Sequence, residues 1–167
     1  MTETERYLAL CCATAVSGKA CNDFPVWVNA EQFYNLAFAH GVASTVYYAV
    51  KDAVGVPEQL LARLEDAHNK AIYRDLMREE EEKRVFEAFD KADINYLPLK
   101  GSVLRLYYPV GDMRVMGDTD LMIEKFARKE ARAVMESCGY TFEQSKSGHD
   151  IYCNDNGNVY ELHYMPE

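Results

Sequence analysis

The chain of 167 residues has a mass of 19.1 kDa, and a chain of this size buries about 70% of its surface on folding. This length predicts one compact domain, or a small domain with a helical annex. The 49% of hydrophobic residues, together with only 9 glycines and 5 prolines, exclude a disordered or collagen-like chain. The 18 basic and 27 acidic residues leave a net charge of −9, which excludes indiscriminate binding to nucleic acid.

The cysteines and the start of the chain indicate where the protein resides. The cysteines are odd in number and form no C-x-x-C pair, so they predict neither a disulfide framework nor a zinc knuckle. The chain opens with two glutamates in place of the basic start of a secretory peptide. Its apolar stretch at residues 7–16 is too short to span a membrane. We therefore expect an amphipathic first helix in a cytoplasmic protein without a membrane partner.

Apolar residues spaced three and four apart predict helices throughout the first half of the chain. One such pattern covers residues 31–50, as a single helix or as a pair broken near Gly41. A further helix begins at Pro57 and continues through Phe89. The charged run at residues 78–84, which holds four consecutive glutamates, indicates a solvated helix face.

From residue 93 onward, the pattern changes to short strands that alternate with helices. Asn156-Gly157 predicts a tight turn between the last two strands, and this turn lacks the spacing of a calcium loop. Gly139 is the expected C-terminal stop of the last helix. We expect an α+β fold in which N-terminal helices, over residues 1–92, precede a small mixed β-sheet flanked by helices, over residues 93–167. The expected strands lie at 94–99, 120–123, 151–153 and 159–164, with one more that opens at 140–142, and the expected helices lie at 103–108 and 126–138.

Two aspartates stand at the start of one expected strand. Asp118 and Asp120 are two residues apart, so on a strand their carboxylates point to one side. Two carboxylates about 4 Å apart repel by roughly 4 kcal/mol at an effective dielectric constant of about 20, and a divalent metal ion relieves this repulsion. The pair is thus a candidate metal site, with turn capping at a loop–strand junction as the alternative.

The turn Lys100-Gly101-Ser102 lies between an expected strand and an expected helix. Gly101 lets a ligand approach the backbone, and the first amide groups of the helix can bind an anion, with Ser102 as a further donor. This position predicts a phosphate site, with a plain strand-to-helix turn as the alternative. Further along the chain, Glu161 and His163 share one face of the last strand, either as solvent-exposed residues or with Glu161 as a third acidic group beside the aspartate pair.

The order of these features resembles the nucleotidyltransferases of the DNA polymerase beta superfamily, and most closely their uncharacterised branch. Members of that branch carry a leucine-lysine-glycine turn, a helix that ends in tyrosine, an arginine, an aspartate pair, and an acidic residue followed two positions later by histidine. The resemblance covers roughly residues 93 to 165. The matching residues here are Leu99-Lys100-Gly101, Tyr107 or Tyr108, Arg114, Asp118-Thr119-Asp120 and Tyr160-Glu161-Leu162-His163.

This resemblance implies an enzyme that moves a nucleoside monophosphate from an NTP to an acceptor hydroxyl, with release of pyrophosphate. It implies a metal cofactor, which is Mg²⁺ with Mn²⁺ as the alternative, and an acceptor among proteins, RNAs or small molecules. The catalytic and metal-binding residues would be Asp118, Asp120 and Glu161. The residues that bind the nucleotide phosphates would be Lys100, Gly101, Ser102 and Arg114.

Other interpretations stay open at this level. Lys100 and Arg114 could instead pair with structural carboxylates, and His163 could be a hydrogen-bonded strand residue. Relatives usually continue beyond the third acidic position, whereas this chain ends at Glu167, so we expect a C-terminally short nucleotidyltransferase-like fold, inactive if truncated. The competing functions are a catalytically degenerate module that binds nucleotide, metal or a protein partner, as in a toxin–antitoxin pair, and metal-dependent phosphoester hydrolysis.

Overall fold

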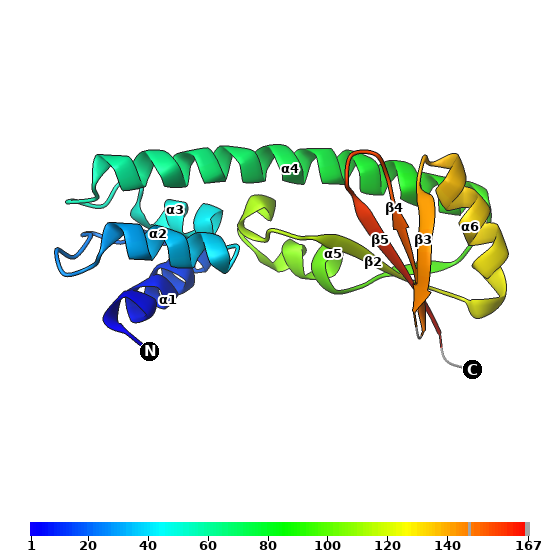
Figure 1. Cartoon of the computed structure of the whole chain (residues 1–167), viewed down its shortest axis with the longest axis horizontal. Helices are drawn as coiled ribbons and strands as arrows, with labels where there is room; N and C mark the ends of the chain where they lie inside the picture. Colours follow the sequence, from blue (N-terminus) through cyan, green and yellow to red (C-terminus); the bar gives the residue numbers. More distant parts are fainter. Residues whose placement is uncertain (147, 166–167) are drawn as a thin grey trace. The chain divides into compact units, whose positions relative to one another are not determined.

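The computed structural model describes residues 1–146 and 148–165, and it has the mixed α+β fold that the sequence predicts (Figure 1). Contacts divide the chain into two compact units. The helical unit comprises residues 1–76 and 105–115, and the sheet unit comprises residues 77–104 and the chain from Met116 onward. The sequence-based boundary between residues 92 and 93 marks the point where the spacing of apolar residues changes, and it stays a prediction. Within the described residues, each helix is too short or too polar to cross a membrane.

Four helices build the helical unit: α1 (Glu3–Val16), α2 (Ala30–Ala39), α3 (Ala43–Val50) and the first part of α4 (Glu58–Lys91). Thr2 caps α1, because its side chain accepts a hydrogen bond from the Glu5 amide while the Glu5 carboxylate accepts one from the Thr2 amide. Gly41 has a φ angle of +66° and separates α2 from α3, so the pattern at residues 31–50 forms a pair of helices. The core of this unit includes the buried side chains of Leu8, Phe33, Val46 and Leu64.

Helix α4 is a single helix of 34 residues that follows Pro57, as the sequence predicts (Figure 1). Its charged run is not solvated throughout: Glu79 and Glu80 are exposed, whereas the side chain of Glu82 is buried. The prediction of a solvated face is therefore wrong for Glu82. The reason is that its carboxylate accepts a hydrogen bond from the Ser102 hydroxyl instead of from water.

Five strands form one mixed sheet in the order β1-β2-β5-β4-β3. They are β1 (Tyr96–Pro98), β2 (Asp118–Ile123), β3 (Thr141–Lys146), β4 (His149–Cys153) and β5 (Val159–Tyr164). Strands β2 and β5 are parallel, and the other neighbouring pairs are antiparallel. The first and last long strands of the unit therefore lie side by side, although about 40 residues separate them along the chain.

Two local turn predictions are confirmed in the sheet unit. Gly157 has a φ angle of +78° in the turn between β4 and β5, where the side-chain oxygen of Asn154 accepts hydrogen bonds from the amides of Asn156 and Asn158. Helix α6 (Arg128–Ser137) is followed by Gly139, which also has a φ angle of +78°. These residues adopt positive φ angles at low cost because glycine has no Cβ atom.

Helices α4 and α6 pack against one face of the sheet. The buried cluster there includes Val85 and Phe89 of α4, Ala131 and Met135 of α6, and Leu121, Ile123, Tyr160 and Leu162 of the two parallel strands. Successive side chains on a strand point to opposite faces, so the odd-numbered residues of β2 enter this core. Asp118 and Asp120 consequently leave the sheet on the other face, away from the two helices.

Candidate functional site

The parallel pairing of β2 with β5 brings two of the predicted acidic residues together. Asp120 and Glu161 are register partners, so both side chains leave the sheet on the face opposite the helical core. His163, two residues further along β5, lies on the same face. One potential ligand atom from each of these three residues falls within 4.8 Å of the others. Carboxylates more than 40 residues apart in sequence thus converge at one point.

Asp120 is the most buried member of this group, with 2% of its surface exposed. Its Oδ1 atom lies 2.7 Å from Lys100 Nζ and 2.8 Å from His163 Nε2. The hydrogen bond to Asp120 raises the pKa of Lys100, and the charges of Asp120, Glu161 and Asp118 raise it further. Lys100 is therefore a protonated counter-ion, and its charge offsets part of the desolvation cost of burying the Asp120 carboxylate.

Asp118 stands at the exposed start of β2, and Arg78 of α4 holds the backbone there. The Arg78 guanidinium donates hydrogen bonds to the carbonyl oxygens of Met116 (2.7 Å) and Asp118 (3.2 Å), and to the Thr119 hydroxyl (3.2 Å). These bonds fix the direction in which the chain begins the strand, and hence the direction of the two aspartates. The sequence analysis missed Arg78, because an arginine beside a glutamate run on a helix looks like an ordinary surface residue.

The predicted phosphate turn lies directly beside β2. The amide of Leu99 donates a hydrogen bond to the Asp120 carbonyl, at 2.9 Å. Lys100 has a positive φ angle of 44° at the start of the short helix α5 (Lys100–Leu104). A Cβ atom on Gly101 would lie 2.8 Å from Met116 Sδ, so the absence of a side chain permits this close approach. The turn is thereby held within the same unit as the aspartates.

Ser102 is engaged within the protein. Its hydroxyl donates a hydrogen bond of 2.8 Å to Glu82 Oε1, and the Thr119 hydroxyl lies 3.5 Å from the same oxygen. Glu82 therefore links the phosphate turn to β2 from the side of α4. Sequence reasoning missed this residue as well, since its contacts depend on how α4 packs against the sheet.

The remaining predicted residue, Arg114, belongs to the helical unit. It lines a pocket of about 180 Å³ together with Tyr108, Met113 and Val115. Its role in nucleotide binding stays a prediction.

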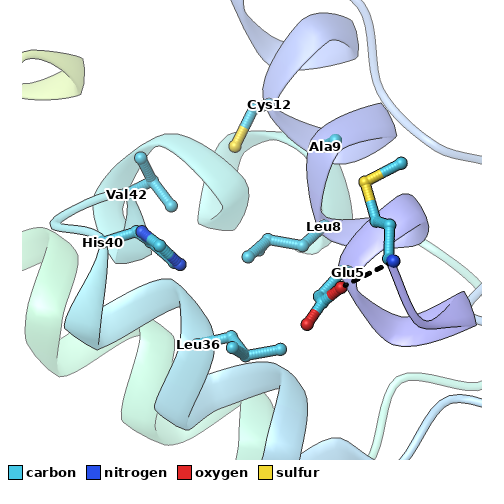
Figure 2. A pocket seen from close by; sticks show the side chains of 8 residues that line it. Glu5, Leu8, Ala9, Cys12, Leu36, His40 and Val42 are labelled. Carbon is cyan, nitrogen blue, oxygen red and sulfur yellow. Dashed lines mark ion pairs between the residues drawn. The ribbon is translucent and has the colours of Figure 1, made fainter.

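A larger hollow of about 360 Å³ lies between α1 and α2 in the helical unit. Figure 2 shows Leu8 and Ala9 facing Leu36 across it, with the Glu5 carboxylate paired to the N-terminal ammonium at 3.8 Å. Most of its wall is apolar, and such a surface offers little to a triphosphate. We therefore place the candidate site on the sheet.

The group formed by Asp120, Glu161 and His163 fits a divalent metal ion by its chemistry. Two carboxylates and an imidazole supply up to three ligand atoms, and carboxylate oxygens are the preferred ligands of Mg²⁺ and Mn²⁺. The Glu161 and His163 side chains keep 20% and 23% of their surface exposed, which leaves room for water or substrate on the open side. Asp118 lies on the same face at the start of β2, but among the described residues it is not a member of this group, so its role as a metal ligand stays a prediction.

Comparisons with known proteins identify the family of the chain. A family model described as uncharacterised nucleotidyltransferase matches residues 28–166. A search of curated proteins found no match. Among solved structures, the antibiotic-resistance factor ANT(2'')-Ia is similar to this chain with a TM-score of 0.48 and 16% sequence identity. That match covers 54% of this chain and 48% of the other, so it spans less than half of the length of the resistance factor.

Proposed function

Because the chain belongs to the uncharacterised nucleotidyltransferase family, we propose that it transfers a nucleoside monophosphate from an NTP to an acceptor hydroxyl. One observation supports this activity above the others: Asp120 and Glu161 converge on one face of the sheet, beside the turn at Lys100 and Gly101. Clustered carboxylates that can hold a divalent metal ion, with a cationic side chain beside them, are what phosphoryl transfer requires.

In the proposed reaction, the acceptor oxygen attacks the α-phosphorus of the NTP. A bond forms between that oxygen and phosphorus while the bond to the bridging oxygen of the β-phosphate breaks. The products are the nucleotidylated acceptor, pyrophosphate and a proton. Glu161, whose side chain is 20% exposed, would accept this proton from the hydroxyl.

Asp118, Asp120 and Glu161 would hold the divalent cofactor, Mg²⁺ or Mn²⁺, which when bound would neutralise triphosphate charge and acidify the attacking hydroxyl. The sheet and helix α4 would hold these ligands in fixed positions. Asp120 and Glu161 sit on paired strands, and Arg78 fixes the backbone at Asp118. Preorganised ligands lower the cost of assembling the reactive arrangement.

The turn residues would bind the triphosphate. Lys100 would neutralise phosphate charge, since its side chain is 60% exposed and can reach beyond Asp120. The family resemblance assigns Gly101 to phosphate binding as well, although Met116 fills the space beside its Cα atom, so phosphate would have to approach it from another side. Ser102 would donate a hydrogen bond once released from Glu82. A phosphate-binding role for Arg114, by a bidentate contact of its guanidinium, rests on the family resemblance alone.

Incubation with each α-labelled NTP tests this proposal. The protein is mixed with Mg²⁺ or Mn²⁺ and a cell lysate as the source of acceptors, and label is sought on proteins, RNAs and small molecules. We expect one class to acquire label while pyrophosphate accumulates. The Asp118→Asn, Asp120→Asn double variant should transfer none.

Other products would point to the competing functions. Inorganic phosphate in place of pyrophosphate would contradict transfer and favour phosphoester hydrolysis. Stabilisation by nucleotide with neither product would contradict turnover and favour a degenerate binding module. Either result overturns the proposed reaction.

A further inference from the structure

The candidate site contains a nitrogen ligand among its oxygens. His163 lies two residues after Glu161 on β5, so strand alternation brings its imidazole to the same face as the carboxylates. A neutral imidazole has one nitrogen with a free lone pair, and this atom can ligate a metal ion. Imidazole is a good ligand for transition-metal ions, whereas Mg²⁺ is usually held by oxygen atoms alone.

The two separations of His163 from the carboxylates match those of neighbouring ligands in a metal coordination shell. His163 Nε2 lies 2.8 Å from Asp120 Oδ1 and 3.5 Å from Glu161 Oε2. For metal–ligand bonds of about 2.0–2.2 Å, neighbouring ligands in octahedral or tetrahedral geometry are about 2.8–3.6 Å apart. The third separation, between the carboxylates of Asp120 and Glu161, is no more than 4.8 Å, so rotation of these side chains would let all three residues share one ion.

A second histidine contacts the ring of His163. His149 on β4 is the register partner of His163, and the two ring centroids lie 4.9 Å apart with an interplanar angle of 34°. His149 Nε2 is 3.8 Å from Glu161 Oε2, a longer distance than either contact of His163 within the group. His149 thus lies next to the group, and in the part of the chain that the structure describes no contact that it makes with Asp120 places it among the three ligands.

The Lys100 ammonium now occupies the cation position beside Asp120. Its Nζ atom is 2.7 Å from the same Oδ1 that faces His163. The Lys100 side chain is 60% exposed, so it can turn away into solvent when a stronger cation arrives. The Asp120 carboxylate therefore already pairs with one cation, Lys100, at the position that a metal ion would take.

We infer that Asp120, Glu161 and His163 bind a first-row transition-metal ion, Mn²⁺, in preference to Mg²⁺, with His163 as the nitrogen ligand. The inference deepens the proposed function, because it names the class of ion at the same site. It can be measured with no nucleotide present. Two of the three ligands are carboxylates, which suit Mn²⁺, and a transition-metal ion accepts an imidazole nitrogen more readily than Mg²⁺ does.

Pulsed electron paramagnetic resonance on the Mn²⁺-loaded protein tests the inference directly. The expected result is a ¹⁴N coupling of the size that a coordinated imidazole produces. Mn²⁺ is preferred to Zn²⁺ as the probe because the free thiols of Cys11 and Cys21, 3.9 Å apart, would compete for a softer ion. Mn²⁺ bound without nitrogen coupling, or no Mn²⁺ binding at all, would overturn the inference.

Histidine variants assign the coupling to one ring. In His163→Ala the coupling should vanish and the Mn²⁺ dissociation constant should rise about tenfold or more, while that of Mg²⁺ changes less than about threefold. His149→Ala is the matched control and should keep the coupling. His163→Gln, which preserves a polar contact with Asp120, repeats the test should the alanine variant fail to fold. Equal weakening of both ions, or a coupling lost only in His149→Ala, would contradict the assignment.

The two proposals fail in different ways. A protein that binds Mn²⁺ through oxygen alone, yet transfers label from an NTP, would remove the role of His163 and leave the proposed function in place. A protein with nitrogen coupling but no transfer would retain the metal site and remove the activity.

Discussion

Asp120 and Glu161 are register partners on two neighbouring parallel strands, and their carboxylates therefore leave the sheet on the same face. This pairing brings Glu161, which lies about 40 positions after the aspartate pair in the sequence, next to Asp120. Had Glu161 been one residue earlier or later, its side chain would point into the core formed with α4 and α6. The candidate site thus depends on strand register as much as on residue identity.

The first prediction concerns ligand-induced stability. A nucleotide with Mg²⁺ or Mn²⁺ at about 100 times its dissociation constant should stabilise the protein by about 2.7 kcal/mol, which corresponds to a rise in Tm of about 5–10 °C. The Asp118→Asn, Asp120→Asn variant should lose this rise, because neither remaining amide replaces a charged ligand. Differential scanning fluorimetry measures it. Asp155→Asn, in the exposed β4–β5 turn, is the control, and a full rise in the double variant would refute the site.

The second prediction separates the two roles of Lys100. In Lys100→Ala, metal binding without nucleotide should strengthen by about two- to fivefold, since the cation that competes for Asp120 is gone. Binding of the metal–NTP complex should weaken, because a phosphate contact is lost. Titration calorimetry measures both affinities. Lys91→Ala, an exposed lysine on α4, should change neither; weaker metal binding in Lys100→Ala would contradict the competition.

The third prediction concerns Arg78. Its three hydrogen bonds to residues 116–119 predict that Arg78→Ala lowers the free energy of unfolding by about 2–3 kcal/mol. Arg84→Ala on the same helix should cost less than about 1 kcal/mol, because the Arg84 side chain is 51% exposed in its pair with Glu81. Urea unfolding compares the two variants. Equal losses would mean that Arg78 does not hold the start of β2.

The fourth prediction concerns acid stability and lies outside the candidate site. Burial alone would raise the pKa of Asp150, but the Arg128 guanidinium, which donates hydrogen bonds of 2.9 Å and 2.8 Å to its carboxylate, outweighs this effect, so the pKa is lowered. Because the pKa of Asp150 is lower in the folded protein than the value of about 3.9 in the unfolded chain, its carboxylate stabilises the fold at pH values above about 4. This stabilisation is lost as the pH falls below about 4 and through the folded-state pKa.

Asp150→Asn should remove that acid-sensitive contribution. At neutral pH the free energy of unfolding of the variant should be about 1–3 kcal/mol lower than that of the wild type. This range is smaller than that for a fully buried ion pair, because the Arg128 side chain is 49% exposed. The difference between variant and wild type should shrink as the pH falls below about 4. Urea unfolding across this range measures it, with Glu130→Gln on exposed α6 surface as the control. A difference that stays constant with pH would contradict the linkage.

Features encoded by short-range chemistry could be predicted from the sequence. The break at Gly41, the stop at Gly139 and the turn at Asn156-Gly157 each follow from glycine's access to positive φ angles. The shared face of Asp118 and Asp120 likewise follows from strand alternation alone. These inferences needed no knowledge of tertiary packing.

Contacts between distant elements could not be predicted in the same way. Glu82 was assigned to solvent because its neighbours in sequence are charged, yet the packing of α4 brings it against Ser102. The Lys100–Asp120 pair joins residues 20 positions apart through the turn after β1. The parallel register of β2 and β5 depends on the order of strands in the sheet, which a single sequence does not specify.

The most direct test of the central claim is a crystal structure of the protein grown with Mn²⁺ and an NTP analogue that cannot be cleaved between its α- and β-phosphates. The account predicts anomalous Mn²⁺ density in contact with the carboxylates of Asp118, Asp120 and Glu161, and the analogue's phosphates beside Lys100 and Gly101. Manganese or nucleotide bound elsewhere, with these three carboxylates free of metal, would contradict it.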